Sequence, residues 1–270
     1  MRSAAAAETI AREQPGIDTD IVDYTSAAVM QRALADCAAV VHLVGILKET
    51  AGNRYVDAHE ATCEALATAA RANQLERIVY VSILGSDAAS NNPCLASKGR
   101  AEDILVAGAT ATVVLQVPMV LGENDFASRA LMARARARFA VTLRGASREQ
   151  PIYAGDVIDA IVAALEPRVP PGTLRLAGPE SVSRTELTRR AGRILNTSPQ
   201  VVSLPVGLGL AAARLFEWIS TNPPVTRAML DVLDHDDDID PRAASTALGI
   251  ELTPLDTMLS KIGAPHDTRH

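Results

Sequence analysis

The stretch "EATCEALATAARANQLERIVYVSILG" (residues 60–85) decides the fold class. Residues 60–73 carry apolar side chains at helical spacing, and residues 77–85 form a short apolar run rich in β-branched residues. A run that is apolar throughout is typical of a strand covered on both faces of a parallel sheet. This helix–strand unit recurs, so the sequence predicts right-handed βαβ units in a doubly wound, mostly parallel α/β sheet.

The rest of the first half follows the same alternation, and the second half departs from it. Further strands are expected at 17–22, 39–45, 110–120 and 172–178, and residues 150–167 are expected to form a strand that runs into a helix. Further helices are expected at 26–37, 96–108, 126–138, 183–195, 207–219, 224–233 and 254–262. We therefore expect two domains: residues 1–122 form the doubly wound domain, and residues 123–270 form a sheet extension with a small, mostly helical C-terminal lobe.

The composition limits the possible functions of the chain. With 270 residues, 48% of them hydrophobic, the chain can bury a sizeable core. Its net charge of -6 argues against nucleic acid as a partner. The three cysteines are widely spaced and predict neither a disulfide framework nor a metal site. No apolar stretch reaches the ~20 residues of a membrane-spanning helix, so we expect a cytoplasmic protein.

Several segments resemble the extended and atypical short-chain dehydrogenase/reductases, which include the NAD-dependent epimerases and dehydratases. "DIVDYTSAAVMQRALADCAAVVHLVG" (20–45) is similar to the middle of their Rossmann-like, NAD(P)-binding domain. The resemblance implies that Asp23 lies near the adenine and that Leu43, Val44 and Gly45 lie along the cofactor. "LQVPMVLGENDF" (115–126) matches a turn of the family in which Pro118 lies near the cofactor.

The family's catalytic residues are only partly present. Ser82 corresponds to the catalytic serine, and "PCLASKGRAEDIL" (93–105) is similar to the Tyr–x–x–x–Lys helix, with Lys98 retained and Cys94 in place of the tyrosine. In active members the tyrosine transfers a proton, the lysine lowers its pKa, and the serine holds the substrate oxygen. A thiol on so short a side chain does not reach the position of a phenol hydroxyl. We therefore expect Cys94 to be a small, partly buried residue rather than a catalytic thiol.

Lys98 and Ser82 each allow a second interpretation. In the family the lysine also hydrogen-bonds the nicotinamide ribose, a role that needs no tyrosine. Ser82 is either a substrate-binding residue or an ordinary strand-end serine, and both interpretations stay open.

Other segments resemble one branch of the family. "HLVGILKE", "SKGRAE" and "LRLAGPESVSRTELTRRAGRIL" are similar to the Rossmann-fold accessory subunit of respiratory complex I and its bacterial relatives. This resemblance implies an NAD(P)-binding protein that is catalytically weak or silent and that joins a membrane respiratory complex. The alternatives are an active NAD(P)-dependent epimerase, dehydratase or reductase of a sugar nucleotide or other carbonyl substrate, and a redox-sensing NADP(H)-binding module.

The glycine-rich turn that cradles the pyrophosphate in this family is not found before residue 17. The sequence aligns from the end of the family's second strand, so the domain at 1–122 is expected to lack its first strand, turn and helix. A start codon assigned too far downstream is the explanation we favour over a natural loss. On this alignment Arg2 lies beside the adenine ribose and favours NADP over NAD.

A few other polar residues have chemistry suited to a site. His42 is expected to be a buried core histidine, Asp156 a helix N-cap, and "DHDDDID" (234–240) a solvated acidic loop. A basic cluster could contact anionic lipid at the inner membrane, an acidic protein or a substrate phosphate, although a solvated helix face is the default. Its members are Arg129, Arg134, Arg136, Arg138, Arg144 and Arg148.

Overall fold

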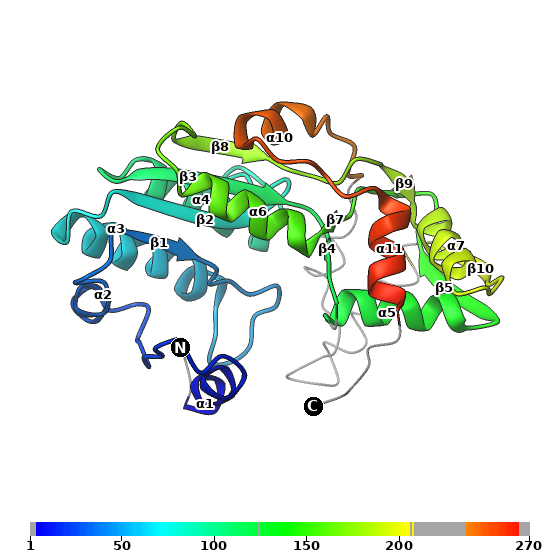
Figure 1. The fold of residues 1–270 in the computed structure, drawn as a ribbon, viewed down its shortest axis with the longest axis horizontal. Coiled ribbons are helices and arrows are strands. Elements are labelled where there is room, and N and C mark those ends of the chain that lie inside the picture. The colour runs from blue at the N-terminus through cyan, green and yellow to red at the C-terminus, as the bar shows by residue number, and fades with distance from the viewer. Residues whose placement is uncertain (1–3, 124, 206, 208–235, 265–270) are drawn as a thin grey trace. The chain divides into compact units, whose positions relative to one another are not determined.

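A computed structural model describes residues 4–123, 125–205, 207 and 236–264 of the chain (Figure 1). The chain divides into two compact units, and each is described by itself. Unit 1 consists of Met1–Ser82, Ser86–Val114 and Pro170–Gly172, and unit 2 consists of Ile83–Gly85, Leu115–Val169 and Thr173–His270. The boundary at residue 122 stays a prediction.

A four-stranded sheet has the strand order β1-β2-β3-β8. The strands are β1 (Ala39–His42), β2 (Arg77–Ile83), β3 (Ala111–Val117) and β8 (Gly172–Arg175). β1 and β2 are parallel, with Ala39 opposite Arg77 and His42 opposite Tyr80. β2 and β3 are buried along nearly their whole length, as expected for strands covered on both faces. The predicted α/β class is confirmed.

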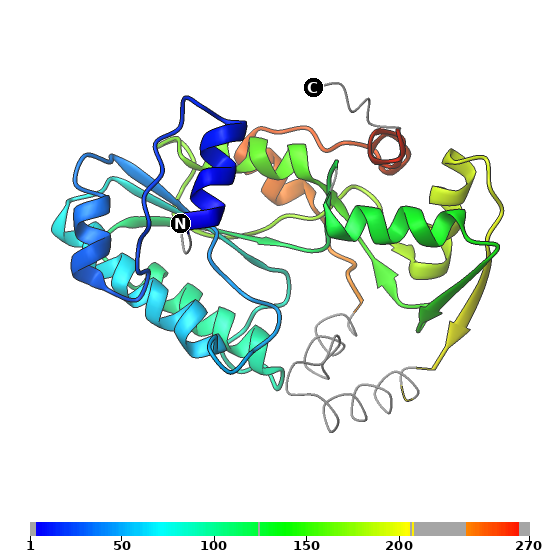
Figure 2. The same cartoon turned by 90° about the horizontal axis from the view of Figure 1, so that it is seen from below.

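The described part of unit 1 also contains several helices. They are α1 (Ala4–Glu13), α2 (Ala27–Ala33), the π-helix η1 (Val56–Ala61), α3 (Thr62–Ala72), which continues directly from η1, and α4 (Pro93–Val106). Figure 2 shows α3 and α4 side by side. Leu66 of α3 and Leu105 of α4 pack with Ile78 and Tyr80 of β2 in the core. The stripe of apolar residues seen at 60–73 is therefore the face that α3 buries.

The strand predicted at 17–22 does not form. These residues have no strand conformation, and β1 lies at the edge of the sheet. A strand needs a neighbour for its backbone hydrogen bonds, and within the described ranges no strand pairs with the outer edge of β1. The prediction of a strand here was wrong because a β-branched pattern alone does not supply a pairing partner.

Unit 2 combines short strand pairs with a helical layer. Its elements are β4 (Val120–Leu121), α5 (Phe126–Arg136), β5 (Phe139–Leu143), β6 (Arg148–Glu149), β7 (Ile152–Tyr153), α6 (Ala154–Ala164), β9 (Val182–Ser183), α7 (Arg184–Ile194), β10 (Gln200–Leu204), α10 (Arg242–Leu248) and α11 (Leu255–Gly263). β5 pairs with β10 and β4 with β7, both in parallel, while β6 and β9 are antiparallel. Leu131 of α5, Leu187 of α7 and Met258 of α11 lie in one buried core.

Two polar side chains of unit 2 fix the start of a helix or the segment before one. Ser183 caps α7 and accepts a hydrogen bond from the backbone N–H of Glu186 at 3.1 Å. Asp156 is not the N-cap of α6, because the helix begins at Ala154 and Tyr153 occupies the N-cap position. Its buried carboxylate instead accepts hydrogen bonds from the backbone N–H and hydroxyl of Thr253, at 2.8 and 2.6 Å. It thus anchors the segment before α11.

Two predicted helices, at 207–219 and 224–233, lie outside the described residues apart from residue 207. Across the ranges that the structure does describe, none of the helices has the length and apolar character needed to cross a bilayer.

Candidate functional site

Lys98 is the centre of a buried polar cluster on the inner face of α4. Its side chain is 5% exposed, and its ammonium donates hydrogen bonds to the hydroxyl of Tyr80 at 2.9 Å and to the carbonyl of Val81 at 3.3 Å. The ammonium also lies 4.5 Å from the centre of the Tyr80 ring, which favours the cation. Burial nevertheless lowers the pKa of Lys98 to about 8. Lys98 is thus held firmly, and within the described chain one of its three N–H donors has no acceptor.

Gly45 makes room for this ammonium. A Cβ atom at position 45 would lie 3.0 Å from Nζ of Lys98 and 3.1 Å from its Cε. A side chain there would push the end of the lysine aside. The structure therefore brings together two residues that the sequence analysis placed at the cofactor, Gly45 and Lys98.

Cys94 is fully buried in the first turn of α4. Asn92 caps the helix, its side-chain oxygen accepting from the N–H of Cys94 at 2.9 Å, and Pro93 occupies the first helical position. The thiol donates to the carbonyl of Ile46 at 3.6 Å. Burial raises the pKa of Cys94 to about 11, although Lys98 opposes the rise. At neutral pH Cys94 is therefore a protonated thiol, directed at the backbone and away from solvent.

Ser82 forms a hydrogen bond to a residue of α4. Ser82 is 2% exposed, and its hydroxyl donates a short hydrogen bond to a carboxylate oxygen of Glu102. It also lies 3.3 Å from the hydroxyl of Ser86. The hydroxyl thus joins β2 to α4, and a role for Ser82 in binding substrate stays a prediction.

Two buried histidines complete the cluster. His42, at the end of β1, lies 3.5 Å from the hydroxyl of Thr62 and packs on Tyr80, as expected of a core histidine. His59, on the π-helix, hydrogen-bonds the backbone of Ile46 through Nε2, and its Nδ1 is buried without a partner among the described atoms. Burial, with the nearby Lys98, lowers the pKa of each histidine to about 4. Both rings are therefore neutral at physiological pH.

A pocket of about 330 Å³ lies entirely within unit 1. Asp23 and Val44, two predicted cofactor residues, line it together with Asp57 and Thr62. The carboxylate of Asp23 accepts from the N–H and hydroxyl of Thr25, at 3.0 and 2.7 Å. This volume lies at the lower end of the range for small-molecule sites, enough for one part of a dinucleotide.

The remaining predicted residues are less informative. Leu43 is 65% exposed beside the pocket residue Val44. Pro118 belongs to unit 2, where it joins β3 to β4, and Arg2 lies outside the described residues. A role for either residue in binding stays a prediction.

Tyr80 is the residue that sequence reasoning missed. It was not assigned because it lies on a strand, two positions before Ser82. That spacing was itself a signal, because alternate residues of a strand share one face and α4 packs on that face. Tyr80 is fully buried, and burial raises its pKa far above the usual value. It therefore orients Lys98 as a neutral phenol and has no exposed hydroxyl with which to protonate a substrate.

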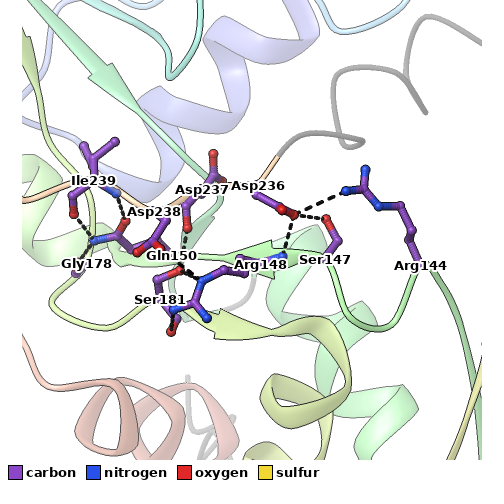
Figure 3. Close-up of polar contacts among 10 residues, drawn as sticks. All are labelled: Arg144, Ser147, Arg148, Gln150, Gly178, Ser181, Asp236, Asp237, Asp238 and Ile239. Atoms are coloured by element: carbon purple, nitrogen blue, oxygen red, sulfur yellow. Dashed lines mark hydrogen bonds and ion pairs between the residues drawn. The ribbon is translucent and has the colours of Figure 1, made fainter.

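In unit 2, part of the basic cluster is paired with the acidic loop (Figure 3). Asp236 accepts from the hydroxyl of Ser147 at 2.8 Å and from the N–H of Arg148 at 2.9 Å, and its carboxylate lies 3.6 Å from the guanidinium of Arg144. Arg148 donates to the carbonyl of Ser181 at 2.8 Å. The loop at 236–240 is therefore largely exposed, as expected of a solvated acidic loop, and it is also bound to the chain around β6.

Comparisons of the sequence with known proteins agree with the resemblance. No family model matches the chain. It is 29% identical over 200 residues to mitochondrial NADH dehydrogenase (ubiquinone) 1 alpha subcomplex subunit 9 of Arabidopsis thaliana, covering 72% of this chain and 50% of the relative. It is 26% identical over 210 residues to ceramide reductase of Caulobacter vibrioides, covering 75% and 65%. The chain thus spans about half to two thirds of the length of these relatives.

Solved structures share the fold. A nucleoside-diphosphate-sugar epimerase from Staphylococcus aureus matches with a TM-score of 0.72 at 17% identity, over 96% of this chain and 88% of that one. UDP-glucuronic acid 4-epimerase from Bacillus cereus, solved with NAD, matches with a TM-score of 0.65 at 17% identity, over 86% and 75%. RMD from Pseudomonas aeruginosa, solved with NADPH, matches with a TM-score of 0.66 at 13% identity, over 95% and 93%. The chain is therefore similar in sequence to a respiratory complex I subunit and to a ceramide reductase, and similar in fold to nucleotide-sugar epimerases.

Proposed function

We propose that this chain binds a nicotinamide nucleotide and turns it over weakly or not at all, as a component of a larger assembly. The observation that carries the proposal is the pairing of a well-held Lys98 with a buried, protonated Cys94 where active relatives have a tyrosine. The donor suited to the ribose is retained, and the proton donor of the reaction is absent from that position.

The residues of unit 1 suit such a ligand. The pocket lined by Asp23 and Val44 would take the adenosine end, and the unused N–H of Lys98 beside Gly45 would donate to the nicotinamide ribose. The nucleotide, when bound, would supply or accept a hydride. A preference for NADP depends on Arg2, which lies outside the described residues.

Catalytic weakness follows from the protonation states around Lys98. The thiol of Cys94 is a poor hydrogen-bond donor, and it already donates to a backbone carbonyl. Tyr80 is fully buried in the core, and the hydroxyl of Ser82 is hydrogen-bonded to Glu102. General acid catalysis needs a group within reach of the substrate and a pKa near the working pH. None of these three groups meets both conditions.

Titration calorimetry with NADPH and NADH tests the binding. We expect saturable binding of at least one, weakened about tenfold by Lys98→Met, since hydrogen bonds from charged groups contribute about 1.5–3 kcal/mol. Gly45→Ala is expected to weaken binding in the same way, because the new methyl displaces the lysine. Lys261→Met, which removes a lysine from α11 in unit 2, is the matched control. Equal binding by the Lys98→Met protein would contradict the proposal.

The second part of the proposal concerns the assembly. It rests on the similarity to a subunit of NADH dehydrogenase. We expect tagged full chain to co-purify with membrane respiratory proteins from its native cells, and to release no oxidised nucleotide when NADPH and carbonyl compounds are supplied. Recovery of the chain alone would contradict this role without affecting the nucleotide proposal.

An active reductase is the second candidate, favoured by the similarity to ceramide reductase. It predicts measurable oxidation of NADPH with a long-chain ketone by the wild-type chain, and its loss in Cys94→Ala if the thiol contributes. If the wild type is silent and Cys94→Tyr gains turnover, the missing tyrosine is the reason for the silence.

A further inference from the structure

An exposed apolar face lies on the β5–β10 strand pair of unit 2. Phe139 and Val141 alternate along β5 with the buried residues Ala140 and Thr142, so they share the outer face. They are 62% and 55% exposed, and Val202 of β10, directly opposite Val141, is 45% exposed. Helix α5 contacts β5 and helix α7 contacts β10. The pair thus buries one face of β5 within unit 2 and presents three large apolar side chains on the other.

All charged side chains in the segment that contains β5 are arginines. Residues 126–148 contain six arginines and no aspartate, glutamate or lysine, in a chain whose net charge is -6. Arg144 and Arg148 are paired with the loop at 236–240, as described above. The guanidinium of Arg138 stacks 5.4 Å from the centre of the Phe139 ring. Neither Arg136 nor Arg138 forms an ion pair with any residue that the structure describes.

We propose that the face made of Phe139, Val141 and Val202, with Arg138 stacked on Phe139 and the exposed Arg136 three residues before Phe139 in the chain, docks on an anionic membrane surface. Apolar side chains flanked by arginines fit the boundary between headgroups and acyl chains, where the rings and methyl groups enter and the guanidinium groups bind phosphate. The strands β5 and β10 themselves carry no acidic residue that would repel an anionic lipid. An acidic protein would satisfy the arginines but gives no reason for the exposed phenylalanine and valines, so we favour the lipid surface. This surface role goes beyond nucleotide binding and does not depend on it.

Sedimentation of the full chain with vesicles tests the proposal. At low salt we expect binding to vesicles of phosphatidylglycerol and phosphatidylcholine, and none to pure phosphatidylcholine vesicles. The double variant Arg136→Gln/Arg138→Gln should bind about thirtyfold more weakly, because each basic residue at an anionic surface contributes roughly a factor of five. Phe139→Ser/Val141→Ser should lose about tenfold, since two partly exposed apolar groups no longer enter the bilayer.

Matched controls carry the same changes elsewhere. Arg32→Gln/Arg71→Gln removes two exposed arginines from unit 1, and Ile158→Ser/Val162→Ser removes apolar groups that are 60% and 57% exposed on α6. Both controls should bind anionic vesicles like the wild type.

Equal binding to both kinds of vesicle, or equal losses in the controls, would overturn the proposal. Retention on immobilised polyglutamate without vesicle binding would overturn it in favour of an acidic protein partner. Thermal unfolding of each variant shows that it is folded, and the salt dependence of the wild type gives a readout that needs no variant.

Discussion

The two polar clusters of this protein use similar groups in opposite surroundings. In unit 1, Lys98 and its neighbours Tyr80 and Cys94 are at most 5% exposed. In unit 2 the side chains of the network are 40–61% exposed, namely those of Arg144, Arg148, Asp236 and Asp238. In unit 1, burial is the main cause of the shifted pKa values of Lys98, Cys94 and the two histidines. In unit 2, hydrogen bonds are the main cause of the lowered pKa of Asp236. A buried polar group without its partner loses both water and the bond, so equal substitutions should be far costlier in unit 1.

The largest expected effect is acid destabilisation through His42 and His59. Both have a folded pKa of about 4, below the usual 6.5, so the folded state resists protonation. Their contribution is complete above pH 6.5 and is lost as pH falls from 6.5 towards 4. Between pH 7 and 5 each histidine should remove about 2 kcal/mol from the free energy of unfolding. Urea titrations at the two pH values measure this loss.

The carboxylates of the acidic loop act in a separate pH window. The pKa of Asp240 is lowered to about 2, mainly by its hydrogen bond from Arg242, so its contribution is lost only as pH falls from 3.8 towards 2. A free energy of unfolding that stays constant from pH 7 to 5 and falls only below 4 would contradict the assignment to the histidines. Ring titrations by NMR give the two histidine pKa values directly.

A matched pair of tyrosine variants should give the next largest contrast. Tyr80→Phe leaves the buried ammonium of Lys98 with Val81 as its only acceptor among the described residues, and should cost about 1–3 kcal/mol of stability. Tyr153→Phe removes a hydroxyl that donates to Glu123 at 2.6 Å, where the carboxylate is exposed and regains water. Its cost should stay below about 1 kcal/mol. Equal losses in urea titrations would show that burial does not set the difference.

The sequence predicted the elements of these clusters better than their contacts. Helix α4, strand β2 and the retained lysine followed from periodicity and resemblance, because both are local properties of the chain. The Lys98–Tyr80 bond depends on which face of β2 meets α4, and the Asp236–Arg148 contact joins residues 88 positions apart. Such pairings are set by tertiary packing, which one sequence does not specify. The strand expected at 17–22 failed for the same reason, since its pairing partner is not local.

The pH dependence contributed by Lys98 should be smaller. The folded pKa of about 8 lies below the usual 10.4, so the folded state binds fewer protons between these values and gains stability as pH rises. From pH 8 to 9 the gain should be about 1 kcal/mol. The buried thiols of Cys63 and Cys94 have raised pKa values and act in the opposite direction. The quantity to measure is therefore the wild type minus Lys98→Met in urea titrations, because the thiol contributions cancel in it. A difference that stays constant with pH would show that the lysine is not desolvated.

The smallest effect is expected for Arg148→Ala in the exposed network. The variant loses the bonds of the guanidinium to Ser181 and Asp238, but keeps the backbone bonds that join position 148 to Asp236 and Asp237. Because this guanidinium is 45% exposed, water replaces most of what is lost, and the free energy of unfolding should fall by less than about 1 kcal/mol. Asp236→Asn keeps the hydrogen-bond acceptor, removes only the charge and should cost still less at high salt, where screening weakens the attraction to Arg144. If Arg148→Ala instead costs as much as Tyr80→Phe, the loop at 236–240 is held by its side chains rather than by the backbone, and the contrast between the two clusters fails.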